Sequence, residues 1–164
     1  MPRLAPVHIF TFKAGLLSRV AHDLQLSLSG GELELDGVEA SVRIPLAGMR
    51  VDGVMRRGRL DPMVLSPKDQ ASIVRTATHE LLGVNQHPDV LFTGRIEGGR
   101  VRGSLSLCGR SVRVDLPVQG GRVVAEIKPS DWGIAPYKAM MGAIRLQDRV
   151  RVEITLPAGS LGSV

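Results

Sequence analysis

Apolar and polar residues alternate along most of this sequence. In residues 112–118, three valines and a leucine alternate with Arg113, Asp115 and Pro117. The same period of two runs through residues 22–28, 38–46, 101–107 and 150–156. Successive side chains of a β-strand point to opposite faces, so this pattern predicts strands with one apolar and one solvated face. Such strands are typical of antiparallel sheets.

Short glycine-containing turns separate these runs. Gly98-Gly99 and Gly120-Gly121 predict two-residue hairpins, and Cys108-Gly109-Arg110 predicts a third tight turn. These turns connect four strands between residues 89 and 128. Further strands are expected at 6–13, 22–29, 32–46 and 143–156, which brings the expected number to eight. An eight-stranded sheet that closes on itself has no exposed edge and can hold one small ligand.

Residues 66–83 show helical spacing instead of alternation. Ser66 is a predicted N-cap, Pro67 suits the first helical position, and Asp69 follows the cap by three residues. Apolar residues then recur every three or four positions, at Ile73, Val74, Ala77, Leu81 and Leu82. Gly83 is a residue type at which helices commonly end. We therefore expect a helix over residues 67–82 whose apolar face covers one end of the barrel.

The expected fold class is all-β, an eight-stranded antiparallel β-barrel with one inserted α-helix. The length of 164 residues suits a single domain with its own core, expected over residues 1–157, followed by a flexible tail at 158–164. Aromatic residues make up only 3%, so valine, leucine and isoleucine must fill the interior. The single cysteine, Cys108, excludes an internal disulfide and any metal site with several cysteines.

The first residues show no run typical of a signal peptide, and no stretch approaches the roughly 20 apolar residues of a membrane span. We therefore expect no membrane span and, if the sequence begins where the protein does, a cytoplasmic location. The net charge of +5 favours a nucleic acid, an anionic membrane surface or an anionic ligand. The one basic cluster, Arg56-Arg57-Gly58-Arg59, is interpreted either as a solvated loop or as a place for an anionic group.

Motifs that would indicate catalysis are missing from the sequence. It contains no glycine-rich phosphate loop, no nucleophile elbow and no Cys or His pairs at zinc spacing, so we expect no metal and no cofactor. An enzyme would have to combine His22 with a carboxylate such as Asp23 or Asp148. The alternation places Asp23 on the face opposite His22, which makes that pair an unfavourable choice.

The expected ligand cavity is formed by inward-facing residues of the barrel. The candidates are His22, Leu24, Leu26, Val42, Ile44, Phe92, Leu105, Val114, Leu116, Trp132, Met140, Met141 and Val152. His22 shares the parity of the apolar positions that follow it. It either bonds a backbone carbonyl near the rim or serves as a polar anchor inside an apolar cavity. Trp132 and the two methionines either pack the core or form a flexible lining, since methionine adapts to irregular partners.

Four segments, in order, resemble the YceI-like family, also called the polyisoprenoid-binding or lipid-binding YceI-like domain. They are His87–Gly94 (HPDVLFTG), Val101–Val112 (VRGSLSLCGRSV), Ser130–Ile134 (SDWGI) and Gln147–Ile154 (QDRVRVEI). The resemblance covers about residues 8 to 156. It implies a lipocalin-like barrel with an inserted helical segment that holds an isoprenoid or other amphiphilic lipid, and a possible homodimer.

The leading hypothesis is therefore that the barrel interior binds or carries a hydrophobic or amphiphilic small molecule without catalysis. The alternative is a nucleic-acid or protein interaction module that uses the basic surface. Single-strand binders stack bases on aromatic rings, and one Trp, one Tyr and three Phe offer little for this, so a nucleic-acid partner is disfavoured. A purely structural role remains open at this point.

Overall fold

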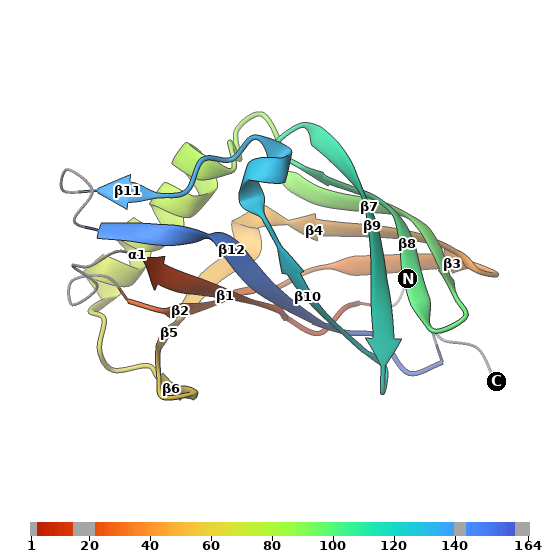
Figure 1. Cartoon of the computed structure of the whole chain (residues 1–164), viewed down its shortest axis with the longest axis horizontal. Coiled ribbons are helices and arrows are strands. Elements are labelled where there is room, and N and C mark those ends of the chain that lie inside the picture. Colours follow the sequence, from red (N-terminus) through yellow and green to blue (C-terminus); the bar gives the residue numbers. More distant parts are fainter. Residues whose placement is uncertain (1–2, 15–21, 140–143, 160–164) are drawn as a thin grey trace.

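Figure 1 shows the computed structural model of the chain, which describes residues 3–14, 22–139 and 144–159. Its strands are β1 (Val7–Ala14), β2 (Leu24–Leu28), β3 (Glu32–Asp36), β4 (Glu39–Pro45), β5 (Met49–Arg56), β6 (Arg59–Asp61), β7 (Asp89–Glu97), β8 (Arg100–Leu107), β9 (Arg110–Gln119), β10 (Arg122–Ile127), β11 (Lys138–Ala139) and β12 (Ile144–Thr155). Its helices are α1 (Pro67–Arg75), the π-helical segment η2 (Thr76–Leu81), and the short 3-10 helices η1 (Leu46–Gly48) and η3 (Pro129–Trp132). The chain is thus mostly β, with one short α-helix.

The strands form one curled antiparallel sheet. Its order is β3-β4-β7-β8-β9-β10-β12-β1-β2-β5-β6, with β11 paired to β12 outside this path. The two ends of the path, β3 and β6, are not paired with each other in the described part of the chain, so backbone pairing does not close the expected ring. The segment before β1 pairs with the start of β3, because Leu4 N–H donates to Gly31 O at 2.8 Å and Arg3 forms an isolated antiparallel β-bridge with Glu32.

The expected count of eight strands is wrong, because the described residues form twelve. A turn at Gly37, whose φ is +61°, divides the expected strand 32–46 into the hairpin β3–β4. The other strands that the sequence did not predict are β5, β6 and β11. Apolar and polar residues do not alternate strictly in β5. Its register with β2 shifts by one residue near Asp52, where the chain makes a β-bulge next to Gly53. A bulge interrupts the alternation of inward and outward residues, so a strand that contains one is difficult to predict from the sequence.

The predicted tight turns are confirmed. Gly98-Gly99, Cys108-Gly109 and Gly120-Gly121 all have positive φ at both residues, between +51° and +75°. This is the conformation of the two-residue turn whose twist matches that of paired strands. Arg57-Gly58 adopts it as well, at +51° and +76°. The basic cluster is therefore the exposed tip of the β5–β6 hairpin, and its interpretation as a solvated loop is the one the structure favours.

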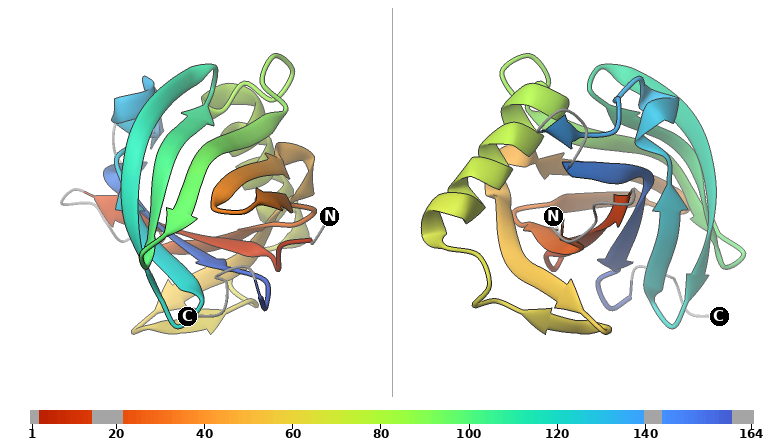
Figure 2. Two further views of the ribbon diagram at one scale, coloured as in Figure 1. Left: turned by 90° about the vertical axis from the view of Figure 1, so that its right-hand side faces the viewer. Right: turned by 60° about the vertical axis from the view of Figure 1, so that its left-hand side comes forward.

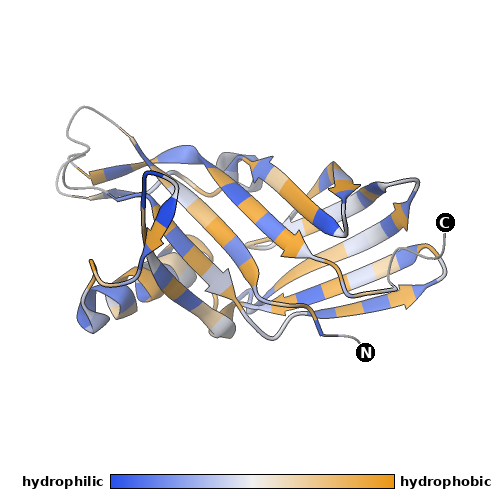
Figure 3. Cartoon of the chain, turned by 90° about the horizontal axis from the view of Figure 1, so that it is seen from below, coloured by the Kyte–Doolittle hydropathy of each residue, from blue (hydrophilic) through white to orange (hydrophobic). Residues whose placement is uncertain are grey.

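The alternation in sequence becomes two faces of the sheet (Figure 3). Pairing across strands places Leu33, Val42, Phe92, Leu105 and Val112 in one row on the inner face. On the other half of the sheet, Ala125, Val152, Ile9, Leu26 and Val51 form a second inner row. The sheet curls so that its inner faces turn toward each other, and the buried core lies between them (Figure 2).

The helix predicted for residues 67–82 is confirmed as α1 followed without a break by η2. Ser66 and Asp69 form the expected capping box, with Asp69 N–H donating to Ser66 Oγ at 3.1 Å. Gly83 has a φ of +62° directly after the helical segment. Ile73, Val74 and Ala77 pack against the core from beside β5, at one end of the sheet (Figure 1).

Candidate functional site

The inner face of the sheet carries the strand residues that the sequence proposed for a cavity, whereas His22 and Trp132 lie outside the strands. Leu24, Leu26, Ile44, Phe92 and Trp132 are buried. Five others are half-buried and pack against the core, namely Val42, Leu105, Val114, Leu116 and Val152. His22 is half-buried and lies two residues before the start of β2, while Met140 and Met141 lie outside the described residues. The inward direction of these strand residues follows from the register, whereas a ligand on them stays a prediction.

The inner face of β9 is apolar but incompletely covered. Val112, Val114, Leu116 and Val118 are half-buried, whereas each residue between them is exposed. The two halves of the sheet separate here, because β9 and β10 pair only through Gln119 with Arg122 and Val118 with Val123. Beyond this short ladder, β9 has a partner strand on one side only. The concave surface therefore presents branched aliphatic side chains that the protein's own atoms do not fully bury.

Trp132 packs into the core, and its one polar atom is satisfied. The residue is only 4% exposed, and its Nε1–H donates to Leu105 O on β8 at 2.8 Å. Local backbone geometry positions the indole, since η3 begins at Pro129 and its last residue, Trp132, is followed by Gly133, whose φ is +76°. The core-packing interpretation of Trp132 is thus the one that the structure supports.

A carboxylate on β12 holds η3 in place. Asp148 Oδ1 accepts from Ser130 N–H at 3.0 Å, and the Ser130 hydroxyl donates to the other carboxylate oxygen. These two hydrogen bonds, the hydroxyl's first, hold the pKa of Asp148 below its ordinary value, and the nearby charge of Lys128 adds to the effect. The lowered pKa favours the charged carboxylate that these hydrogen bonds require.

The catalytic alternative that combined His22 with Asp23 or Asp148 finds no support in the geometry. Asp23 Oδ1 accepts from Lys13 N–H at 2.7 Å, and Asp148 bonds Ser130. Among the described residues, neither carboxylate forms a hydrogen bond or ion pair with His22. Both carboxylates hold backbone segments in place.

Thr11 is an inward-facing polar residue that the sequence analysis missed. It pairs with Leu24 on one side and Val150 on the other, so its side chain shares the inner face. Its hydroxyl oxygen is buried and has no hydrogen-bond partner within the described part of the chain. Buried polar groups are almost always hydrogen-bonded, so such an orphan needs an explanation. A threonine within a strand is an unremarkable sequence feature, and only the register shows where it points.

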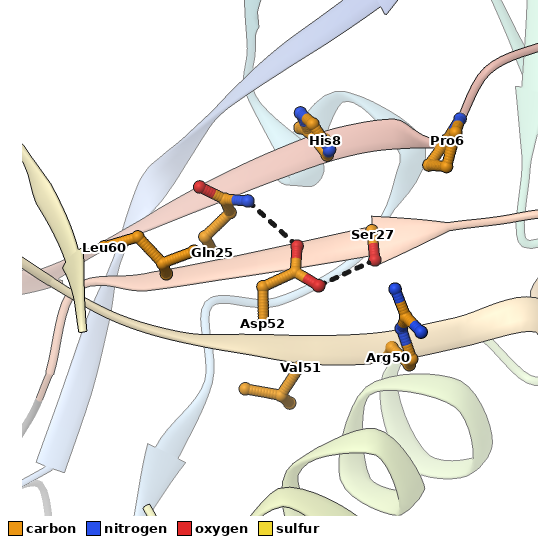
Figure 4. A pocket seen from close by; sticks show the side chains of 8 residues that line it. All are labelled: Pro6, His8, Gln25, Ser27, Arg50, Val51, Asp52 and Leu60. Atoms are coloured by element: carbon orange, nitrogen blue, oxygen red, sulfur yellow. Dashed lines mark hydrogen bonds between the residues drawn. The ribbon is translucent and has the colours of Figure 1, made fainter. Parts of the chain in front are cut away.

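A second place of interest lies on the outer face of β1, β2 and β5 (Figure 4). It is a hollow of about 500 Å³ lined by Pro6, His8, Gln25, Ser27, Arg50, Val51, Asp52 and Leu60. Asp52 accepts from Gln25 Nε2 at 2.9 Å and from Ser27 Oγ at 3.0 Å. The bulge in β5 places Asp52 opposite these two side chains of β2, which periodicity alone did not reveal.

This outer pocket does not have the arrangement of a hydrolytic triad. In a triad the histidine lies between the serine and the carboxylate. It accepts the proton of the serine hydroxyl and donates a hydrogen bond to the carboxylate. Here the Ser27 hydroxyl donates directly to Asp52, although His8 is the cross-strand neighbour of Ser27. The pocket therefore offers polar groups for hydrogen bonding, and its serine, Ser27, is not activated as a nucleophile.

The described residues contain neither a cluster of metal ligands nor a membrane-spanning helix. Within the described ranges, no three His, Cys, Asp or Glu side chains gather closely enough to hold a metal ion. None of the helices in the same ranges combines the length and the apolar character that crossing a bilayer requires.

Comparison with known proteins supports the resemblance to the YceI-like family at the level of the fold. The sequence matches no protein-family model and no curated protein. The structure is similar to that of a polyisoprenoid-binding domain from Saccharophagus degradans implicated in plant cell wall breakdown. That match has a TM-score of 0.60 and 10% sequence identity, and covers 93% of this chain and 94% of that chain.

A second similar structure is that of the YCEI protein of Campylobacter jejuni. It matches with a TM-score of 0.47 and 15% identity, and covers 78% of this chain and 82% of that chain. The conclusion about the fold depends on the first of these two structures, which spans nearly the whole of both chains.

Proposed function

We propose that the space enclosed by the curled sheet binds an elongated apolar or amphiphilic molecule, such as an isoprenoid or another lipid, without catalysis. The observation that carries this proposal is the half-buried aliphatic inner face of β9. Aliphatic side chains that face a concave surface gain free energy when a ligand covers them, about 25 cal/mol per Å² of apolar area. The polyisoprenoid-binding description of the structurally similar domain agrees with this ligand class.

Thr11 is the polar contact that we propose for the same ligand. Its orphaned hydroxyl lies on the inner face among leucine and valine side chains. Ligand sites are commonly apolar with a few placed polar groups that fix orientation. A hydroxyl or carboxyl group at one end of the ligand would satisfy Thr11. The role of polar anchor that the sequence left open for His22 stays a prediction beside it.

Isothermal titration with a long-chain fatty acid and with an isoprenyl phosphate, both below the concentrations at which they self-assemble, tests the proposal. Val114→Phe adds bulk on the inner face and should weaken binding about tenfold or more. Val124→Phe is the matched control, because Val124 is 45% exposed on the outer face of β10, and it should bind like the wild type. Failure of both lipids to saturate, or equal losses in the two variants, would contradict the proposal.

Thr11→Val gives a second and independent measurement. Valine has nearly the same shape without the hydroxyl, so removing an orphaned buried hydroxyl should raise the free energy of unfolding by about 1–3 kcal/mol. The same change should weaken binding of the fatty acid. A variant that is less stable than the wild type would show that Thr11 has a structural partner instead. The homodimer implied by the family resemblance stays a prediction, which light scattering in solution can check.

A further inference from the structure

A groove runs between the helical segment and strand β5, five places along the sheet from the strand β9 on which the interior proposal depends. Its volume is about 550 Å³, within the usual range of small-molecule sites. The helical side of the groove is one stripe of residues three or four apart, which includes Pro67, Ala71, Val74 and Thr78, and the strand side includes Met49 and Val51. Residues at this spacing lie along one face of a helix, so the groove is elongated and largely apolar.

Three basic side chains stand along this groove without acidic partners. They are Arg50 of β5 and Arg75 and His79 of the helical segment. None of the ion pairs or side-chain hydrogen bonds found in the described ranges involves any of the three, and the residues lining the groove include no aspartate or glutamate.

Several arginines elsewhere on the sheet surface are paired with carboxylates. Arg95 pairs with Glu39 at 2.7 Å, and Arg100 pairs with Asp115 at 2.5 Å. The groove therefore combines an apolar wall with uncompensated positive charge. Arg50 also lines the polar outer pocket (Figure 4), so the same side chain borders both hollows.

We propose that this groove binds a single-chain amphiphile with a phosphate head group. The head group lies on Arg50 and Arg75, which are suited to two-pronged hydrogen bonds with phosphate oxygens, and His79 lies beside them. The alkyl chain follows the apolar stripe of Ala71 and Val74. A recessed groove beside one helix suits one chain better than a bilayer surface. The lining contains no Phe, Tyr or Trp on which a nucleic-acid base could stack.

The test is a titration of the full chain with decyl phosphate below its self-assembly concentration, followed by NMR chemical shifts of the amides of residues 67–79. We expect saturable shifts along this segment. Arg75→Gln and Arg50→Gln should each weaken binding about tenfold, the loss of one charge-assisted contact. Arg59→Gln removes the same charge from the exposed β5–β6 hairpin outside the groove, and should leave the affinity unchanged.

Two comparison ligands separate the chemistry of the head from that of the tail. Inorganic phosphate should bind much more weakly than decyl phosphate, and decanol should not produce the shifts that depend on Arg75. Equal affinity for inorganic phosphate would overturn the amphiphile proposal, and so would an equal loss in Arg59→Gln and Arg75→Gln. The Val114→Phe variant should retain groove binding while losing the interior ligand, so failure of one proposal is distinguishable from failure of the other.

Discussion

Individual side chains of this protein follow the direction that the strand period assigns to them, but their burial is uneven. Leu33 and Leu26 are almost wholly inaccessible, at 0% and 4%. Val114 and Val152 point the same way and stay half-buried. Parity along a strand decides the face on which a side chain lies. The amount of protein packed over it depends on the curl of the sheet, which parity does not describe.

Leu33→Ala should be among the most damaging substitutions in the chain. Its side chain lies in the inner row beside Val42 and is inaccessible, so truncation leaves a cavity and should cost about 2–5 kcal/mol. Leu91→Ala is the control on the outer face of β7, where the side chain is 45% exposed, and should cost little. Chemical denaturation of the two variants measures the difference. Equal losses would show that the inner and outer faces are wrongly assigned.

The short 3-10 helix η3 shows how one polar contact positions a whole segment. Ser130 reaches Asp148 through its backbone and its side chain, and this fixes the approach of η3 to β12. Trp132 belongs to the same helix, so the contact also helps to place the indole in the core. The sequence motif SDWG indicated this segment, but the residue that holds it in place is Asp148 of β12, which is distant in the sequence.

The Ser130–Asp148 contact should make stability depend on pH. A carboxyl group with a lowered pKa in the folded state contributes stability that is present above its unfolded pKa, near 3.8, and is lost as the pH falls through the lower folded value. Ser130→Ala should therefore lower the melting temperature at neutral pH, and the gap to wild type should narrow below pH 3.8. Ser104→Ala, on the outer face of β8, is the control. A gap independent of pH would contradict this account.

The charge of the whole molecule is positive, but the outer face of the sheet neutralises much of it locally. Arg122 pairs with Glu153 at 3.0 Å, and Arg149 pairs with Glu126 at 3.2 Å. Two of the three phenylalanines lie beneath arginines, with Arg149 at 3.9 Å from the ring centre of Phe12 and Arg151 at 4.4 Å from that of Phe10. These rings are covered and do not offer free faces for base stacking.

Binding to single-stranded DNA should accordingly be weak and governed by salt. Any complex formed at low ionic strength is expected to disappear in a gel shift at physiological ionic strength, because only non-specific contacts with phosphates support it. A complex that survives this salt concentration, and that prefers one sequence, would contradict the argument. Nucleic-acid binding would then become the leading hypothesis for the function.

The sequence by itself determined the strand-rich class, the hairpin turns, the position of the helix and the inward direction of the apolar residues in the strands that it predicted. These depend on local geometry, since a period of two, a pair of glycines and a capping box act over a few residues. The motifs in the second half of the chain also indicated the YceI-like fold.

Only the tertiary structure decided the number of strands, the separation of β9 from β10 and the gathering of distant polar residues. The bulge at Asp52 and the pairing of Thr11 with Val150 join segments far apart in the chain. The groove likewise joins Arg50 to Arg75 across different elements. Register and curvature arise from the packing of all strands together, so no window of sequence contains them.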